Sequence, residues 1–311
     1  SVRYAFSGRV SVGFQQFRQG FPYNNAQNKV SVVWSHRKEA KSNPLWAFSS
    51  NVNFISDNKT KNNLDPINPQ YFNNSFNSDI NLNRTFPGKP ITIGMKISLR
   101  QNSIAKNISL TSPILNVNMT RVFPFKNLIK NPNKSWKKTV QNVGLTYSLE
   151  SQNKSSFGDS LLSNFDYRGI GDQFMNGINQ GISLQTTAGL FKNAVKITPS
   201  ISYGNKINLQ QIQKNYNALN NSTKIDTLDK YGMAHEFSMN MNLTTVLFSY
   251  YRFIGKNKPL LRHLMTPSIG YRYVPLLNPL TTSNAGINQS LISYSPYERS
   301  IYNVGNTSAS S

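Results

Sequence analysis

The sequence predicts an all-β protein, an antiparallel transmembrane β-barrel in which this chain supplies about twelve long strands of a larger barrel. Three observations predict this fold. Apolar and polar residues alternate with a period of two along most of the chain. The alternating runs often reach about 10 residues, whereas strands of globular sheets usually have about 5 or 6. The connections between runs are alternately long and short, as in transmembrane barrels.

The first run shows the alternation clearly. Between Val2 and Phe14, even positions are apolar or glycine, and odd positions are small or basic. Further runs repeat the pattern near 72–86, 91–100, 143–150, 195–203, 237–244 and 265–273. A soluble β-sandwich also alternates, because each of its sheets has one wet face. The polar positions here are rich in Gly, Ser, Asn, Lys and Arg, which is typical of the aqueous interior of a barrel.

Connection lengths give an independent indication. The expected strands lie near 2–17, 29–37, 46–56, 71–86, 90–100, 107–121, 140–151, 178–190, 194–204, 233–253, 262–274 and 290–302. One alternate set of connections is mostly long: 18–28, 57–70, 101–106, 152–177, 205–232 and 275–289. The other set is mostly short: 38–45, 87–89, 122–139, 191–193 and 254–261. A sandwich has no reason to sort connections in this way, although 101–106 and 122–139 break the rule.

Two of the expected strands contain an irregularity. Pro113 interrupts the strand near 107–121, and the apolar positions change there from even to odd residue numbers. A β-bulge explains both facts, because it inserts a residue and tolerates proline. A similar change of register is expected near Thr245 and Val246.

The chain is strongly basic, with a formal net charge of +22. Such a charge attracts nucleic acid, anionic lipid or acidic polysaccharide, and lysine-rich solvated loops are the alternative explanation. The basic residues that fall on the polar register, and are therefore expected to line a lumen, are Arg3, Arg9, Arg37, Lys96, Arg100, Lys196 and Arg272. A cationic lumen suits the passage of an anionic, phosphate-bearing molecule. The alternative is that these side chains only form hydrogen bonds across a filled interior.

Arg84 and Arg121 are exceptions to this pattern, because they fall on the apolar register. Charge that faces lipid at mid-depth costs about 2–4 kcal/mol for Arg or Lys. Both residues lie near strand ends, where a long side chain can reach the membrane interface.

Catalytic and metal-binding constellations are scarce. The absence of cysteine excludes disulfides, thiolate metal sites and cysteine catalysis. His36, His235 and His263 are far apart, lack a metal-ligand spacing and are expected to be polar anchors near strand ends. Loop aspartates are candidate Ca²⁺ ligands, although solvated acids are the simpler interpretation: Asp57, Asp65, Asp159, Asp166 and Asp172. We therefore expect no enzyme, no cofactor and no metal site.

Several segments resemble the LptD family, the D component of the lipopolysaccharide transport machinery in the outer membrane of Gram-negative bacteria. The segments are Lys29–Arg37 with its Trp-x-His, Trp46–Phe54, Tyr71–Asn74, Leu115–Phe125 and Arg262–Tyr271. Together they span most of the chain. Their specificity is moderate, because barrel strands converge in composition.

The resemblance implies a barrel that translocates lipopolysaccharide and inserts it into the outer leaflet, with a plug lipoprotein, the E component, in its lumen. It also implies an N-terminal periplasmic jellyroll that receives lipopolysaccharide from a periplasmic bridge protein, and a lateral gate between the first and last strands. We expect residues 1–311 to be one outer-membrane barrel segment, with the jellyroll and the closing C-terminal strands outside it. The disulfide cysteines of some members are missing, and no gate residue is assigned.

Three alternative functions stay open. Another outer-membrane porin or solute transporter is favoured if the strands nearly complete a barrel, whereas an unpaired strand at each end favours the larger barrel. A secreted adhesin or carbohydrate-binding β protein would be soluble without detergent. A barrel enzyme would need a catalytic pair that the sequence does not offer. The expected partners are lipopolysaccharide, the plug lipoprotein, the periplasmic bridge protein and outer-membrane lipid, but not nucleic acid.

Overall fold

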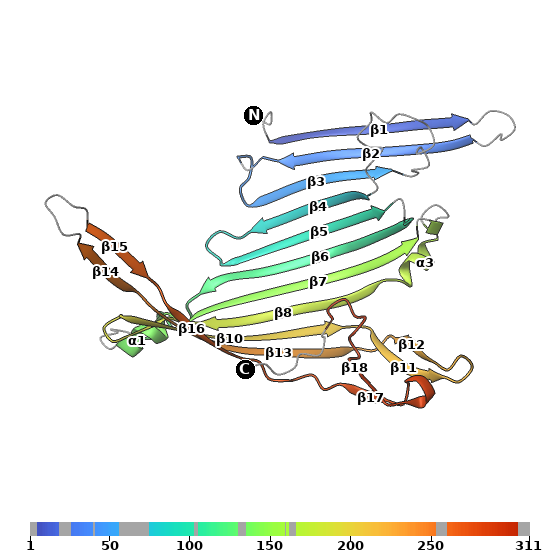
Figure 1. The fold of residues 1–311 in the computed structure, drawn as a ribbon. Coiled ribbons are helices and arrows are strands. Elements are labelled where there is room, and N and C mark those ends of the chain that lie inside the picture. Colours follow the sequence, from blue (N-terminus) through green and yellow to red (C-terminus); the bar gives the residue numbers. More distant parts are fainter. Residues whose placement is uncertain are drawn as a thin grey trace.

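One large antiparallel sheet dominates the computed structural model (Figure 1). The structure describes residues 5–18, 26–39, 41–55, 75–102, 105–129, 135–158, 160–161, 166–252 and 260–303. The 12-stranded sheet follows the order β1-β2-β3-β4-β5-β6-β7-β8-β10-β13-β16, and β9 pairs with β10. Among the described residues, no ladder joins β1 to β16, so each is an edge strand. The predicted antiparallel fold is confirmed.

The strands of the sheet are long, as the alternation predicts. They are β1 (Phe6–Arg18), β2 (Ala26–Lys38), β3 (Trp46–Ile55), β4 (Ser75–Thr85), β5 (Ile91–Asn102), β6 (Asn107–Val122), β7 (Gly144–Gly158), β8 (Met175–Gln185), β9 (Ala188–Leu190), β10 (Val195–Asn208), β13 (Gly232–Thr245) and β16 (Ser268–Tyr273). Each long strand pairs with the next long strand along the chain, which is the meander expected of an up-and-down barrel wall.

Cross-strand register sorts the side chains onto two faces, because residues directly opposite each other in an antiparallel pair point to the same side. One row runs from Leu82 through Met95 to Leu115, and a second runs from Leu184 through Ile201 to Met239. We call the side that carries these rows the apolar face. The opposite side, which carries rows such as Asn83–Gly94–Asn116, is the polar face.

The apolar face is open to its surroundings. Val12 and Ile269, on strands at opposite edges of the sheet, are both 69% exposed, and Met239 is 45% exposed. A continuous exposed apolar surface of this kind marks an interface with another apolar phase. In contrast, the buried side chains among the described residues include Phe76, Ile108 and Phe157, which lie in one row at the same end of the strands.

Phe76, in the alternating run 72–86, departs from the exposed apolar face. The alternation places Phe76 with the outward apolar residues, yet its side chain is only 2% exposed. It lies in a buried row on the apolar face with Gln101, Ile108 and Phe157, at the end of the strands where α3 (Tyr167–Gly171) packs. Ser155 of the same face donates a hydrogen bond from Oγ to the Ile170 carbonyl at 3.3 Å, so α3 covers this end of the face.

Both predicted irregularities are present. The β5–β6 and β6–β7 ladders shift register around Pro113, and this shift keeps apolar residues on one face across the bulge. The strand predicted over 233–253 is divided at Val246 into β13 and β14 (Leu247–Arg252). Its partner is divided at Thr266 and Pro267, where the Pro267 carbonyl accepts from the Thr245 N–H at 3.1 Å.

The connections contain structure that the alternation does not predict. β14 and β15 (Leu260–Met265) lie mostly within the expected strands 233–253 and 262–274, but they form an arm that projects beyond the sheet in Figure 1 instead of extending it. The hairpin β11 (Gln211–Asn217) and β12 (Ser222–Leu228) occupies the expected loop 205–232. The strand expected near 290–302 is wrong, because only β18 (Ile292–Tyr294) forms there and pairs with β17 (Thr281–Ser283).

The helices are short. They are α1 (Ser135–Gln141), α3 and the 3-10 helix η4 (Ile287–Gln289). No helix in the described part of the chain is long and apolar enough to cross a membrane.

A pair of neighbouring residues tests the two faces. Met241 lies on the apolar face between Pro199 and Tyr271, and Asn242 lies on the polar face. We expect Met241→Arg to lower the free energy of unfolding in lipid vesicles by about 2–4 kcal/mol, because the charge then faces acyl chains. The control Asn242→Arg should change it by less than about 0.5 kcal/mol. Equal losses in denaturant titrations of the two variants would contradict the assignment of faces.

Candidate functional site on the polar face

Basic side chains outnumber acidic ones on the polar face. Of the residues predicted to line a lumen, Arg9, Arg37, Lys96, Arg100, Lys196 and Arg272 all lie in register on this face. Arg3 lies outside the described residues. That this face borders a water-filled lumen remains a prediction.

Two further basic residues of this face lie in segments that the sequence pattern predicts to be loops. Lys154 and Lys206 are in register on the polar face of β7 and β10. The sequence does not predict strand there, because the apolar alternation fades before these strands end. The acidic residues on the same face are Asp79, Glu150 and Glu236.

Two of the cations are neutralised locally. Lys96 Nζ lies 2.9 Å from Asp79 Oδ1, and Lys206 Nζ lies 2.6 Å from Glu236 Oε1. Among the described residues, neither Arg9 nor Arg272 forms an ion pair with a carboxylate. The polar face therefore has a net positive charge, and the unpaired arginines lie on both edge strands, β1 and β16.

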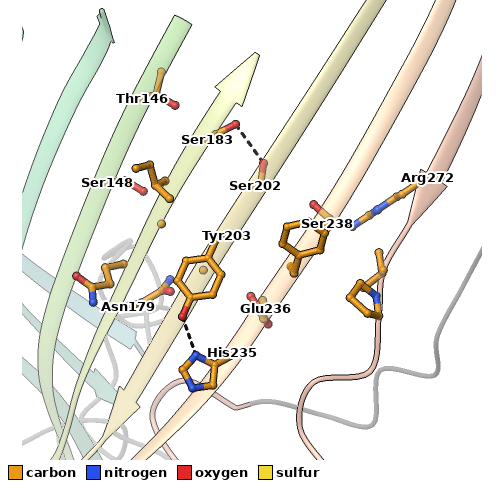
Figure 2. Close-up of a pocket in the computed structure, with 17 residues that line it drawn as sticks. Thr146, Ser148, Asn179, Ser183, Ser202, Tyr203, His235, Glu236, Ser238 and Arg272 are labelled. Atoms are coloured by element: carbon orange, nitrogen blue, oxygen red, sulfur yellow. Dashed lines mark hydrogen bonds between the residues drawn. The ribbon is translucent and has the colours of Figure 1, made fainter. Parts of the chain in front are cut away.

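A hollow of about 450 Å³ opens on the polar face over β7, β8, β10 and β13 (Figure 2). The polar side of its wall carries hydroxyl and amide side chains, together with one cation and one anion: Thr146, Ser148, Asn179, Ser183, Ser202, Ser238, Arg272 and Glu236. Apolar and aromatic side chains complete the lining, among them Ile182, Tyr203, Phe237, Val274 and Pro275. Ser202 Oγ donates to Ser183 Oγ at 3.1 Å. Gly181 and Gly204 lie opposite each other on the polar face, and the lack of side chains there deepens the hollow.

This wall has the chemistry of a saccharide site. Hydroxyl and amide groups both donate and accept hydrogen bonds, so they match the hydroxyls of a sugar. The Arg272 guanidinium adds a group that can bind a phosphate or carboxylate in bidentate geometry.

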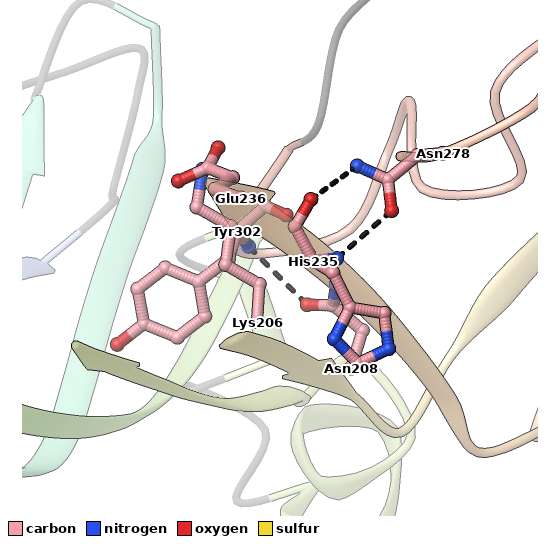
Figure 3. A network of polar contacts seen from close by, with 6 residues as sticks. All are labelled: Lys206, Asn208, His235, Glu236, Asn278 and Tyr302. Carbon is pink, nitrogen blue, oxygen red and sulfur yellow. Dashed lines mark hydrogen bonds and ion pairs between the residues drawn. The ribbon is translucent and has the colours of Figure 1, made fainter. Parts of the chain in front are cut away.

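A C-terminal strap, defined as residues 294–302, lies across the polar face beside the hollow. Its last residue, Tyr302, is buried over β7 and donates from its hydroxyl to Glu150 Oε1 at 3.0 Å and to the Glu150 carbonyl at 3.1 Å. Asn208 Nδ2 donates to the Tyr302 carbonyl at 3.3 Å (Figure 3). Burial raises the pKa of the Tyr302 phenol well above its usual range, so the hydroxyl remains a donor.

Two glycines make room for the strap. A Cβ atom at Gly177 would collide with Ile301 and Tyr302, and one at Gly232 would collide with Tyr297. Tyr297 Oη donates to the Met233 carbonyl at 3.0 Å. The strap therefore packs closely against the polar face. Pro296 lacks a backbone N–H, which prevents the strap from continuing as the predicted strand.

An ion pair fixes the strap to the hairpin beside the sheet. Lys214 Nζ of β11 lies 2.7 Å from Glu298 Oε2, and Ile212 N–H donates to the Pro296 carbonyl at 2.9 Å. Glu298 is half exposed, so the backbone bond is the more dependable of the two contacts.

Histidines serve as anchors at the edges of the apolar face. His235 Nδ1 lies 2.8 Å from Tyr203 Oη (Figure 2), and Asn278 binds both the N–H and the carbonyl of His235 at 2.8 Å (Figure 3). Asn278 thereby satisfies the backbone of β13 beyond the end of β16. His36 stacks on Phe6 with ring centroids 5.4 Å apart.

The acidic residues show no metal constellation in the described ranges. Asp166 caps α3 by accepting from the Gly169 N–H at 3.0 Å. Asp57, Asp65 and Asp159 lie outside the described residues, so their expected role as solvated acids remains a prediction.

Replacement of Tyr302 tests the strap. We expect Tyr302→Phe to lower the free energy of unfolding by about 1–3 kcal/mol, because it removes one of the two donors to the partly buried Glu150 carboxylate and leaves only the amide of Gln152. The matched control Tyr216→Phe removes an exposed hydroxyl that donates to Asn221 at 3.1 Å, and should cost less than about 0.5 kcal/mol. Equal stability of the two variants in denaturant titrations would show that the strap contact is not maintained.

Comparison with known proteins agrees with this architecture. A family model described as LptD protein matches residues 1–311. No curated protein matches the chain. The chain therefore belongs to the LptD family of outer-membrane β-barrel proteins, which act in lipopolysaccharide transport.

Proposed function

We propose that this chain forms part of the wall of a barrel that translocates lipopolysaccharide and inserts it into the outer leaflet. The observation that carries the proposal is the division of the sheet into an exposed apolar face and a cationic polar face. The apolar face is suited to membrane acyl chains, and the polar face is suited to an aqueous lumen.

The polar face matches the headgroup of lipopolysaccharide in two ways. Its uncompensated arginines, such as Arg9 and Arg272, attract phosphate groups, and the hydroxyl-lined hollow beside Arg272 suits sugars. Ion pairs such as Lys96–Asp79 moderate the local charge. A moderated charge favours passage, because conduction requires a ligand to bind weakly enough to leave again.

The partners follow from the family and remain part of the proposal. The plug lipoprotein would occupy the lumen against the polar face. The periplasmic bridge protein would deliver lipopolysaccharide through an N-terminal domain outside residues 1–311. These residues would then form one barrel segment, and lipopolysaccharide would leave through a gate between the first and last strands of the whole barrel.

A porin or solute transporter is the second candidate, because a polar, hydroxyl-lined lumen wall also suits small solutes. The edge strands favour the first candidate. Within the described residues, β1 and β16 each pair on one side only, which fits a wall segment of a larger barrel.

Site-specific photo-cross-linking distinguishes these functions. A photoreactive amino acid at Ser238 or Asn240, next to Arg272 on the polar face, should cross-link to lipopolysaccharide in the full-length protein in cells. Met239, between them on the apolar face, is the matched control and should cross-link at least about tenfold less. Cross-links that arise only from loop positions would count against a luminal route.

A further inference from the structure

The apolar face continues at one end of the sheet into a rim with unusually exposed aromatic side chains. Trp136 of α1 is 61% exposed, and Phe191, in the turn between β9 and β10, is 80% exposed. Large aromatic residues are rarely left so open on a surface that only contacts water. We call α1 together with the turn 190–193 the α1 rim.

Hydrogen bonds hold the α1 rim in place. Thr186 Oγ1 donates to the Thr139 carbonyl of α1 at 2.7 Å, and Gln141 Nε2 donates to the Ile129 carbonyl at 2.7 Å. The turn places Phe191, Lys192 and Asn193 in the left-handed region, with φ values of 49°, 58° and 72°. A run of non-glycine residues in the left-handed conformation raises the free energy of the folded backbone. Such strained backbone is concentrated at binding and functional surfaces.

An open apolar groove lies between α1 and this turn. Its volume is about 770 Å³, and its lining includes Trp136, Val140, Ala188, Leu190 and Phe191. Leu190 and Ala188 pair with Val195 and Ile197, so the groove continues the apolar face of the sheet. A groove that continues a membrane-facing surface is placed to receive lipid.

The charge around the groove has one sign. Segments 105–149 and 173–225 contain no Asp or Glu. Lys137 Nζ lies 6.0 Å from the Trp136 ring centroid, and Lys138 and Lys192 are exposed nearby. Arg121 crosses the adjacent strand end and donates to the Gln185 carbonyl at 2.9 Å. Aromatic residues beside cations form the usual anchor of a protein at the headgroup level of a bilayer.

The position of the α1 rim along the strands indicates which leaflet, and therefore which class of lipid, it contacts. It lies at the same end of the sheet as the short turns 39–45 and 86–90, and in outer-membrane barrels the short turns face the periplasm. The leaflet on that side consists of phospholipid. We propose that the α1 rim binds anionic phospholipid of the periplasmic leaflet, with Lys137, Lys138 and Lys192 at the headgroups and the groove around an acyl chain.

Fluorescence of Trp136 tests the depth of the rim. The chain has three tryptophans, so Trp34→Phe and Trp46→Phe in the full-length protein leave Trp136 as the only one in residues 1–311. In nanodiscs that contain phosphatidylglycerol, lipids brominated close to the headgroup should quench this tryptophan more strongly than lipids brominated at the chain ends. Quenching by aqueous iodide without quenching by brominated lipid would overturn the proposal.

Lipid selectivity tests the charges. We expect Lys137→Gln, Lys138→Gln and Lys192→Gln together to reduce the enrichment of phosphatidylglycerol over phosphatidylcholine in the lipid that copurifies with the protein. Each removed charge should weaken binding about fivefold at low salt. The matched control replaces Lys106, Lys224 and Lys230 with Gln, at the other end of the strands, and should retain the enrichment.

Equal enrichment in the two triple variants would overturn the proposal, as would enrichment of lipopolysaccharide at the rim instead of phosphatidylglycerol. Cross-linking of lipopolysaccharide to the polar face is a separate readout. The proposed transport function can therefore fail while the rim still binds phospholipid, and the reverse also holds.

Discussion

Cross-strand register is the constraint on which the rest of the molecule depends, because a slip of one residue would turn a whole strand inside out. In the row Leu82–Met95–Leu115, such a slip in β5 would place Lys96 among apolar neighbours. The bulge at Pro113 shows the same constraint at work. Without the inserted residue, the second half of β6 would present Asn116 and Asn118 to the apolar side. The strand register therefore decides which residues lie on each face, and the distribution of apolar residues in turn favours a single register.

Charged side chains are compensated in different ways on the two faces. On the polar face, Lys96 and Lys206 have carboxylate partners, and water or ligand can solvate the remaining cations. On the apolar face, cations occur at strand ends and lie over aromatic rings. Arg84 lies 4.8 Å from the Trp46 ring centroid and 4.6 Å from that of Phe86. Arg121 also lies over a ring, 5.3 Å from the Phe123 centroid, but a register shift after Met119 places its side chain beside Gly144 on the polar face. Contact with a ring compensates part of the lost hydration, and the long side chain reaches the interface.

Periodicity in the sequence predicts whatever depends on alternation, which includes the two faces, the bulge at Pro113 and the division at Val246. It fails where the determinants are not periodic. Lys154 and Lys206 belong to strand ends where polar residues such as Asn153, Ser155 and Asn205 interrupt the apolar register, so backbone pairing extends these strands beyond the alternation. Phe76 has the right periodicity for the exposed face, but it lies in a buried row with Gln101, Ile108 and Phe157, which come from three other strands.

The strap is the clearest example of a feature that the sequence hides. The segment around Tyr294 and Tyr302 alternates like a strand, but its contacts depend on a bare backbone at Gly177 and a carboxylate at Glu150. These partners are distant in sequence, and single-sequence patterns carry no information about such pairing. Similarly, the hollow next to the strap arises from hydroxyl and glycine residues on four strands, none of which forms a local motif.

We infer that one side of this sheet contacts acyl chains and that the other contacts water. Because the chain has no cysteine, single cysteines at successive positions from Phe237 to Thr244 of β13 can report on it directly in reconstituted vesicles. Spin labels at odd positions should collide with oxygen dissolved in the bilayer, and labels at even positions should collide with a water-soluble relaxation reagent. We expect accessibility to alternate with a period of two, and uniform accessibility along the strand or the opposite phase would contradict the assignment of the two faces.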